Sequence, residues 1–233
     1  MLSVKSVTKL YGKTIANKDI SFEIDDGQIA ILLGPNGAGK TTIFNMLTGI
    51  YRPTSGSIEL EGESLVGLKP YQFAQRGISR TFQNIRLFSN ASVIDNVKMA
   101  ATMHSKDNLV SSLLRTRTMV KHERELDEKV MSLLEPLNLA DKADLLAKNL
   151  PYGDQRRLEL ARALMTDPKI LILHEPTRGI DVETKTEIYH LLRRLVNEGM
   201  GIILVTGDML ELIGLSDRIA VMFEGRIAGS VPA

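Results

Sequence analysis

Three short segments of the chain alternate between apolar and polar residues. They are residues 2–9, 20–24 and 57–60. Alternation with a period of two is typical of a strand that has one face on the core and the other in solvent. Antiparallel sheets tolerate such a solvated face, so we expect these segments to pair as antiparallel strands.

Four other runs are apolar without alternation, which favours strands buried on both faces, as in a parallel sheet. These runs are Gln28–Leu33, Ile170–Leu173, Ile202–Val205 and Ile219–Phe223. Helical patterns lie between them, for example the apolar face of residues 188–196, a helix that Gly199 closes. This alternation of strands and helices predicts an α/β fold with a mainly parallel, doubly wound sheet at its core.

The middle of the chain, residues 84–150, has helical patterns and no convincing buried strand. We therefore expect a single domain in which residues 1–83 and 151–233 form the α/β core and residues 84–150 form a helical insert. Within the insert, Ser111–Glu125 is basic and poor in apolar residues, so we expect an exposed helix or loop. Its charges are best explained as a solvated face, and contact with a partner or with lipid headgroups is the alternative.

Length, charge and cysteine content exclude several classes of function. The 233 residues fit one α/β domain, or one domain with an insert. The formal net charge of +1 gives no electrostatic reason to expect binding to nucleic acid. The absence of cysteine excludes disulfides, thiolate zinc sites and a cysteine nucleophile. No apolar run approaches the roughly 20 residues that span a bilayer, so we expect an intracellular domain.

A phosphate-binding loop is the strongest motif in the chain. Residues 34–41 match G-x-x-x-x-G-K-[ST], between the buried run Gln28–Leu33 and an expected helix at Thr41–Gly49. The glycines let backbone N–H groups surround a phosphate, Lys40 reaches the β- and γ-phosphates, and the Thr41 hydroxyl can bind Mg²⁺. The nucleotide-binding residues expected here are Gly34, Pro35, Asn36, Gly37, Ala38, Gly39, Lys40, Thr41 and Thr42.

Several separated segments add to this loop, in a fixed order along nearly the whole chain. They are Tyr11, Thr81–Gln83, Leu150–Arg157, Ile170–Glu175 and Thr177–Asp181. With them the sequence resembles the ATPase subunits of ATP-binding cassette (ABC) transporters, and it looks most like those of branched-chain amino acid importers. The resemblance implies a P-loop NTPase fold of the ABC type, in which an antiparallel β subdomain and a helical insert join the core.

The resemblance also implies a role for individual residues. Tyr11 would stack on adenine, and Gln83 would sense the γ-phosphate and contact Mg²⁺ together with Thr41. Glu175, at the end of a buried strand, would be the catalytic carboxylate that orients water. A signature segment would precede a helix at Gln155–Met165 and meet the γ-phosphate held by another subunit. The signature residues expected to do so are Tyr152, Gly153, Asp154 and Gln155.

Cofactors and partners follow from the same resemblance. ATP and Mg²⁺ would bind between two ATPase subunits, as a homodimer or a heterodimer. Integral membrane permease chains would dock on the helical insert, and a solute-binding protein would act indirectly through them. The chain would then sit peripherally on the cytoplasmic face of the membrane, without nucleic acid as a partner. An ABC protein that acts on DNA or ribosomes is a weaker alternative, because those usually carry two cassettes.

Three positions depart from the family pattern. His174 stands where an aspartate would help to hold Mg²⁺, and Gly207 stands where a histidine would contact the γ-phosphate. Pro151-Tyr152 replaces the usual Ser-Gly of the signature, and the last third of the chain looks more like the second cassette of simple-sugar importers. We expect weaker retention of Mg²⁺, and direct metal ligation by His174 is a minor alternative. A regulatory cassette with impaired hydrolysis is therefore the rival to an active ATPase.

Overall fold

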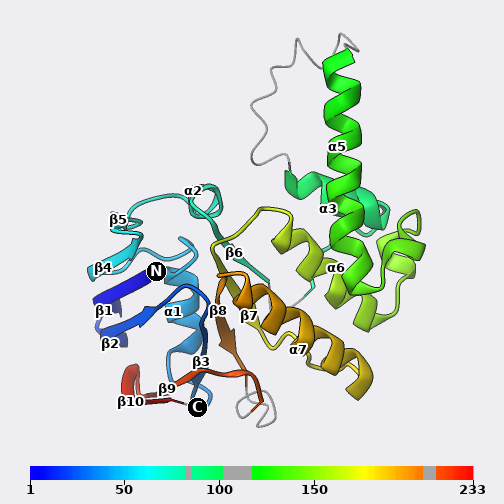
Figure 1. Cartoon of the computed structure of the whole chain (residues 1–233). Helices are drawn as coiled ribbons and strands as arrows, with labels where there is room; N and C mark the ends of the chain where they lie inside the picture. The colour runs from blue at the N-terminus through cyan, green and yellow to red at the C-terminus, as the bar shows by residue number, and fades with distance from the viewer. Residues whose placement is uncertain (82–84, 102–116, 207–213, 233) are drawn as a thin grey trace.

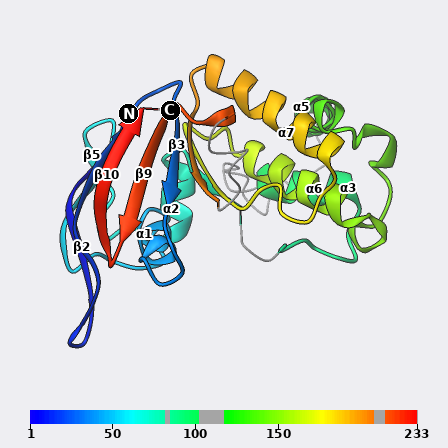
Figure 2. The same ribbon diagram turned by 90° about the horizontal axis from the view of Figure 1, so that it is seen from below.

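The computed structural model describes residues 1–81, 85–101, 117–206 and 214–232. Two β-sheets lie on one side of the molecule and a group of helices on the other (Figures 1 and 2). Among the described residues, no helix combines the length and the apolar character that crossing a membrane requires.

The smaller sheet is antiparallel and has the strand order β2-β1-β4-β5. Its strands are β1 (Leu2–Tyr11), β2 (Thr14–Ile24), β4 (Ser55–Leu60) and β5 (Glu63–Ser64). In β1, Leu2 pairs with Ile24 on one side and with Leu60 on the other, and all three are buried. The expectation of antiparallel strands is confirmed, although β2 begins six residues before the predicted segment 20–24.

The larger sheet has the order β10-β9-β3-β8-β7-β6, and its strands are parallel except for β10. They are β3 (Ile29–Leu33), β6 (Ile78–Arg80), β7 (Ile170–His174), β8 (Gly201–Val205), β9 (Arg218–Phe223) and β10 (Arg226–Pro232). The expectation of a mainly parallel sheet is confirmed. Burial of β9 on both faces is wrong, because β9 lies beside the exposed edge strand β10 and Phe223 is 54% exposed.

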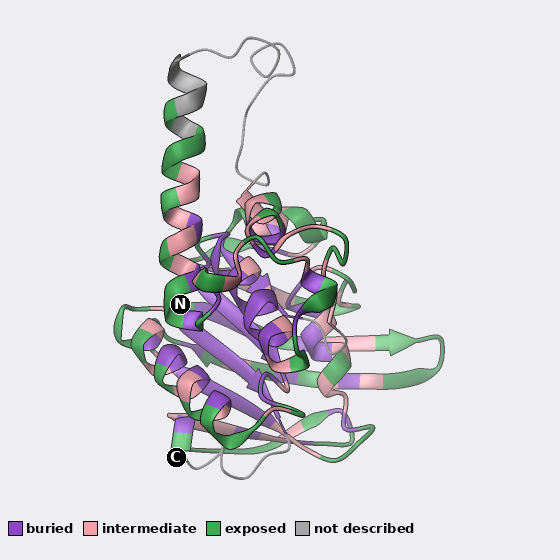
Figure 3. Cartoon of the chain, turned by 90° about the vertical axis from the view of Figure 1, so that its right-hand side faces the viewer, coloured by how far each residue is buried: buried purple, intermediate pink, exposed green. Residues whose placement is uncertain are grey.

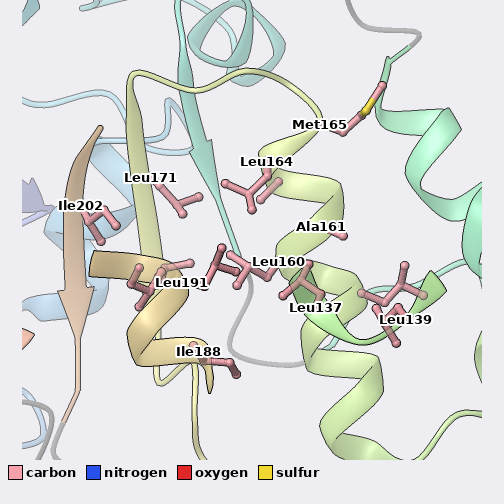
Figure 4. Packing of buried hydrophobic residues seen from close by; sticks show 14 of the residues in the cluster. Leu137, Leu139, Leu160, Ala161, Leu164, Met165, Leu171, Ile188, Leu191 and Ile202 are labelled. Carbon is pink, nitrogen blue, oxygen red and sulfur yellow. The ribbon is translucent and has the colours of Figure 1, made fainter. Parts of the chain in front are cut away.

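Each central strand supplies side chains to two separate cores. In β8, Ile202 and Leu204 join the core under the helices, whereas Ile203 and Val205 join the core shared with the antiparallel sheet. This division explains why these runs have no polar alternation, since neither face of the strand meets water. Figure 4 shows the first core, where Leu171 and Ile202 from the sheet converge with side chains of the helices.

Helices surround the larger sheet and form the insert. They are α1 (Lys40–Met46), α2 (Pro70–Gln75), α3 (Val93–Ala101), α5 (Arg117–Leu134), α6 (Tyr152–Leu164) and α7 (Val182–Asn197), with short 3₁₀ turns at Glu135–Leu137, Ala140–Lys142 and Ala147–Asn149. Asp181 caps α7, because its Oδ1 accepts a hydrogen bond of 2.9 Å from the N–H of Thr184. That bond holds the pKa of the Asp181 carboxyl below its usual value.

The described part of the insert is helical, with one isolated bridge between Ser92 and Leu146. Helix α5 is anchored by Val130 and Leu134, which are buried against α3 and α6, and it then extends away from the body (Figure 3). On the extending part, the side chains of Lys121 and Arg124 are 79% and 82% exposed. A helix is therefore confirmed from residue 117 onward, as is its exposure at Lys121 and Arg124, while residues 111–116 lie outside the described part. Division of the chain at residues 83 and 151 stays a prediction.

Candidate functional site

A hollow of about 740 Å³ lies at the carboxyl ends of β3, β7 and β8. Ligands of open α/β sheets usually bind outside this edge, where loops from several strands meet. The residues that line it are Thr14, Ile15, Ala16, Gly34, Asn36, Gly37, Ala38, Gly39, Lys40, Thr41, Thr42, His174, Glu175, Arg178, Val205, Thr206, Glu224 and Gly225. Of the nine residues expected from the phosphate loop, all but Pro35 therefore face this space.

The loop between β3 and α1 needs glycine for steric reasons. Gly39 precedes α1 with a φ of 93°, and a Cβ there would lie 2.4 Å from the Asn17 side-chain nitrogen. At Gly34 a Cβ would lie 2.4 Å from the carbonyl oxygen of Met222. The loop is thus packed against β2 and β9 on its outer side. Loops of this kind bind anions through backbone N–H groups that face the ligand.

Lys40 is the cation of this loop. Its Nζ donates hydrogen bonds to the carbonyl oxygens of Gly34, at 2.5 Å, and Pro35, at 2.9 Å. Burial lowers the pKa of the Lys40 ammonium, and the nearby negative charge of Glu175 opposes that shift. Lys40 is held only by neutral carbonyls, so an entering phosphate can draw it away from them.

Glu175 follows β7 directly and faces the same hollow. Its backbone has a φ of 45°, a left-handed conformation that costs a residue other than glycine about 1–3 kcal/mol. The N–H of Glu175 donates to the carbonyl of Val205 at 2.8 Å, which anchors this turn to β8. The carboxylate accepts a hydrogen bond of 2.7 Å from Nη1 of Arg178. The structure therefore places the expected catalytic carboxylate opposite the phosphate loop.

His174 is the last residue of β7 and is only 9% exposed. Its ring meets the ring of Phe44 edge-on, with 5.7 Å between centroids. Its Nδ1 is buried without a hydrogen-bond partner among the described residues. Burial lowers the pKa of His174, with the charge of Glu175 opposing, so the imidazole is neutral near pH 7. A neutral ring supplies no negative charge where the family pattern has an aspartate.

The residues that line the hollow fit a divalent cation only when the nucleotide supplies most of the ligands of that cation. The described residues contain no group of three or more His, Asp or Glu side chains placed to hold a metal. The Thr41 hydroxyl lines the hollow, and Mg²⁺ commonly combines few protein ligands with phosphate oxygens and waters. The other expected ligand, Gln83, lies outside the described residues, as does Gly207.

Tyr11, the expected adenine contact, lies beside the hollow and is not part of its lining. The ring is 44% exposed and packs edge-on against Tyr51 at 5.8 Å between centroids. Burial raises the pKa of the Tyr11 hydroxyl, and a hydrogen bond with Thr42 opposes that shift. Through Thr42 the ring is adjacent to the phosphate loop, and stacking of Tyr11 on a base stays a prediction.

The signature segment occupies the first turn of α6. The expected start of this helix at Gln155 is wrong, because α6 begins at Tyr152 with Pro151 as its N-cap residue. Proline suits a helix start, since it has a fixed φ and no N–H to satisfy. Asp154 is held by Lys142 at 2.8 Å and by Arg157 at 3.4 Å, and the Gln155 side chain donates to Leu150.

None of the four signature residues, Tyr152 to Gln155, lines the hollow. Tyr152 and Gly153 pack instead against the loop that follows Glu175. A Cβ built on Gly179 would lie 3.4 Å from the Tyr152 ring, and one built on Gly153 would lie 3.4 Å from Ile180. The phosphate loop and the signature are therefore in separate places within one chain.

The hollow also contains residues that sequence reasoning missed. Thr14, Ile15 and Ala16 form its wall from β2, while Glu224 and Gly225 come from the turn after β9. No local pattern marks these residues, because they reach the site only through the packing of the two sheets. Arg178 had a usable signal, since it follows Glu175 by three residues within a tight turn.

Comparison with known proteins agrees with this geometry. The sequence pattern of the ABC transporter family matches residues 17–178. The chain is 41% identical to the high-affinity branched-chain amino acid transport ATP-binding protein LivG of Escherichia coli, over 97% of this chain and 89% of that protein. It is 38% identical to BraF of Pseudomonas aeruginosa, a protein with the same description, over the same shares of the two chains.

A solved structure gives the same result for the fold. A nucleotide-free ATP-binding cassette from an ABC transporter superposes with a TM-score of 0.85 and 25% identity, over 100% of this chain and 91% of that one. The matched region includes the phosphate loop and Glu175, and the relatives match nearly the whole chain. The chain belongs to the ABC transporter family, as one of its ATP-binding cassettes.

Proposed function

We propose that this chain binds MgATP and hydrolyses it to drive an importer of branched-chain or other amino acids through separate permease chains. The observation that carries the proposal is the single hollow in which Lys40 and Thr41 face Glu175. The substrate class rests on the relatives, since LivG and BraF are named as branched-chain amino acid transport proteins and match almost end to end.

The chemistry begins with binding of the polyphosphate. Backbone N–H groups of residues 36–41 surround the phosphates, and Lys40 exchanges its two carbonyl partners for phosphate oxygens. A bound Mg²⁺ would neutralise charge on the phosphates, with Thr41 and Gln83 as its protein ligands. Glu175 then orients or deprotonates the water that attacks the terminal phosphate.

Two cassettes are needed to complete each site in this proposal. The signature residues Tyr152 to Gln155 lie outside the hollow of their own chain. Tyr152 is 46% exposed at the start of α6, where a second molecule can reach it. The second cassette would be another copy of this chain or a related subunit, and its α6 would approach the terminal phosphate.

The permease would dock where the insert meets the core. A second hollow of about 440 Å³ lies there, with a mainly apolar lining. Its exposed apolar residues come from both parts: Ile50 after α1, Tyr71 from α2, Phe88 before α3 and Met99 from α3. A membrane partner seated there would hold the chain on the cytoplasmic face of the membrane, and a solute-binding protein would act through that partner.

Steady-state ATP turnover tests the proposed activity. Purified chain is assayed with Mg²⁺, alone and with its permease, beside Glu175→Gln as the matched control. Turnover well above that of Glu175→Gln supports an active ATPase. Turnover equal to that of the control would contradict it.

A cassette with impaired hydrolysis is the second candidate function, and the neutral, buried His174 favours it. Such a chain would bind ATP tightly and form the regulatory half of a heterodimer. Binding with a dissociation constant in the micromolar range, combined with turnover at background, would establish this second function.

A further inference from the structure

Arg178 is a charged residue of the nucleotide hollow that lies in the family segment Thr177–Asp181, and the mechanism above gives its side chain no role. It lies in the loop between Glu175 and α7, and its side chain is 67% exposed. Its N–H donates to the carbonyl of Glu175 at 3.2 Å, so a tight turn holds the two residues together. Its guanidinium donates to the Glu175 carboxylate at 2.7 Å.

Among the described residues, the charged side chains that line the hollow balance before any nucleotide binds. The fully charged side chains in its lining are Lys40 and Arg178, which are positive, and Glu175 and Glu224, which are negative. His174 adds no charge near pH 7, because burial lowers its pKa. A triphosphate adds negative charge to the hollow even with Mg²⁺ bound, so it attracts the cations of the lining.

The two cations differ in what holds them. Lys40 bonds to two neutral backbone carbonyls, whereas Arg178 bonds to a carboxylate. That carboxylate belongs to the residue that must be free to orient water. While Arg178 donates to it, Glu175 is a poorer acceptor for the proton of that water. The resting chain thus has its catalytic group engaged by a side chain from the same turn.

We propose that Arg178 senses the terminal phosphate of ATP: it leaves Glu175 when a triphosphate binds, donates to the terminal phosphate, and thereby frees the Glu175 carboxylate for catalysis. This inference rests on the proposed function, since it requires ATP in this hollow. ADP has no terminal phosphate at that place, so with ADP the ion pair between Arg178 and Glu175 stays intact.

The exchange of partners is physically easy. The side chain of Arg178 is 67% exposed and that of Glu175 is 28% exposed, so water screens this ion pair in part and breaking it costs less than breaking a buried pair. The planar guanidinium donates two parallel hydrogen bonds to a phosphate, and charge-assisted bonds of this kind are strong. Since the backbone turn fixes Arg178 beside Glu175, only its side chain has to rotate toward the phosphate.

Binding measurements on the full chain with Mg²⁺ test the exchange. The probes are the slowly hydrolysed analogue adenosine 5′-(β,γ-imido)triphosphate and ADP, titrated by calorimetry. Arg178→Ala should weaken binding of the triphosphate analogue by about 10- to 100-fold, the range for a hydrogen bond to a charged group, and leave ADP nearly unchanged. Arg178→Lys should keep part of the preference for the triphosphate. Arg124→Ala removes an exposed arginine that pairs with Glu128, and should change neither affinity.

Glu175→Gln should change the affinity for the triphosphate analogue in the opposite direction. Removing the carboxylate charge frees Arg178 in the resting chain, so the triphosphate analogue should bind several-fold more tightly than to wild type. Glu175→Gln with Arg178→Ala should lose that gain. Turnover should be lower in Arg178→Ala than in wild type, because the contact with the terminal phosphate is lost.

Three outcomes overturn the inference. Equal affinities of wild type and Arg178→Ala for the triphosphate analogue would show that Arg178 does not reach the phosphate. An equal loss of affinity for ADP and the analogue would show a general charge effect. A rise in turnover of Arg178→Ala without a change in preference would make the ion pair only inhibitory. If wild type binds neither nucleotide, the proposed function itself fails, so the two failures are distinguishable.

Discussion

The two walls of the nucleotide hollow contrast with each other. The wall at residues 34–42 keeps each residue of the phosphate motif, and Gly34 and Gly39 are packed too closely to admit a side chain. The wall at the end of β7 combines a neutral histidine, a strained glutamate and an arginine that engages it. In the proposed mechanism the first wall binds phosphate and the second acts on it, so binding and hydrolysis would be specified by different residues and could be lost separately.

The largest expected effect is on ATP turnover, from a substitution in the wall at the end of β7. Glu175→Gln should lower ATP turnover by about 10²–10⁴-fold, the usual contribution of a general base, while nucleotide binding is kept. A coupled assay for released phosphate, together with calorimetric titration of ATP, measures both. Loss of binding in this variant would show that the two walls do not act separately.

Lys40→Ala tests the binding wall and should have the next largest effect. Removal of the ammonium deprives the phosphates of charged hydrogen bonds, and we expect about a 100-fold loss of ATP affinity. Lys5→Ala is a suitable control, because Lys5 pairs with Glu59 on the antiparallel sheet, away from the hollow. An unchanged ATP affinity in Lys40→Ala would refute the assignment of residues 34–41 as the phosphate site.

His174→Asp sharpens the contrast between the walls. A carboxylate at this position adds the negative charge that the neutral imidazole lacks, so Mg²⁺ affinity in the presence of nucleotide should rise about tenfold. Binding of Mn²⁺, followed by electron paramagnetic resonance as a substitute for Mg²⁺, measures this without reference to turnover. His174→Asn is the uncharged control and should leave the metal affinity near that of wild type.

The smallest expected effect is on stability at acid pH. Burial holds the pKa of His174 in the folded chain below its usual value of about 6.5, which applies in the unfolded chain. At a pH between the folded and unfolded pKa values, the unfolded chain is therefore protonated at His174 and the folded chain is not. The contribution of His174 to stability is therefore complete above pH 6.5 and is lost as the pH falls toward the folded pKa. Urea unfolding of wild type and His174→Asn from pH 7.5 to 5 should show a shallower acid decline in the variant.

The wall at residues 34–42 was predictable because its motif lies within one short segment of the sequence. Gly34, Gly39 and Lys40 are fixed by a short stretch of backbone, and the buried strand before them has a clear apolar pattern. The sequence identifies Tyr152 to Gln155 as a group, but it predicts the start of α6 too late. Proline is common in loops as well as at helix starts, so Pro151 does not mark the boundary between them.

Other parts of the site depend on contacts between distant segments. The wall formed by Thr14 to Ala16 exists because β2 crosses the phosphate loop, and nothing in those three residues announces it. Strands β6 and β10 are not predicted from the sequence, and the reasons are again physical. The first has only three residues, and the second is a mostly exposed edge strand with little apolar content.

Helix α5 has a mechanical consequence. Its 18 residues make a rod about 27 Å long, clamped at one end by the buried side chains of Val130 and Leu134. A force applied to the helix beyond Lys121 therefore acts as on a beam fixed at one end, and it bends the helix at the fixed end, where Val130 and Leu134 are buried. The clamp is part of the same core as Leu158 and Ala161 of α6, so bending the rod strains the helix whose first turn carries Tyr152.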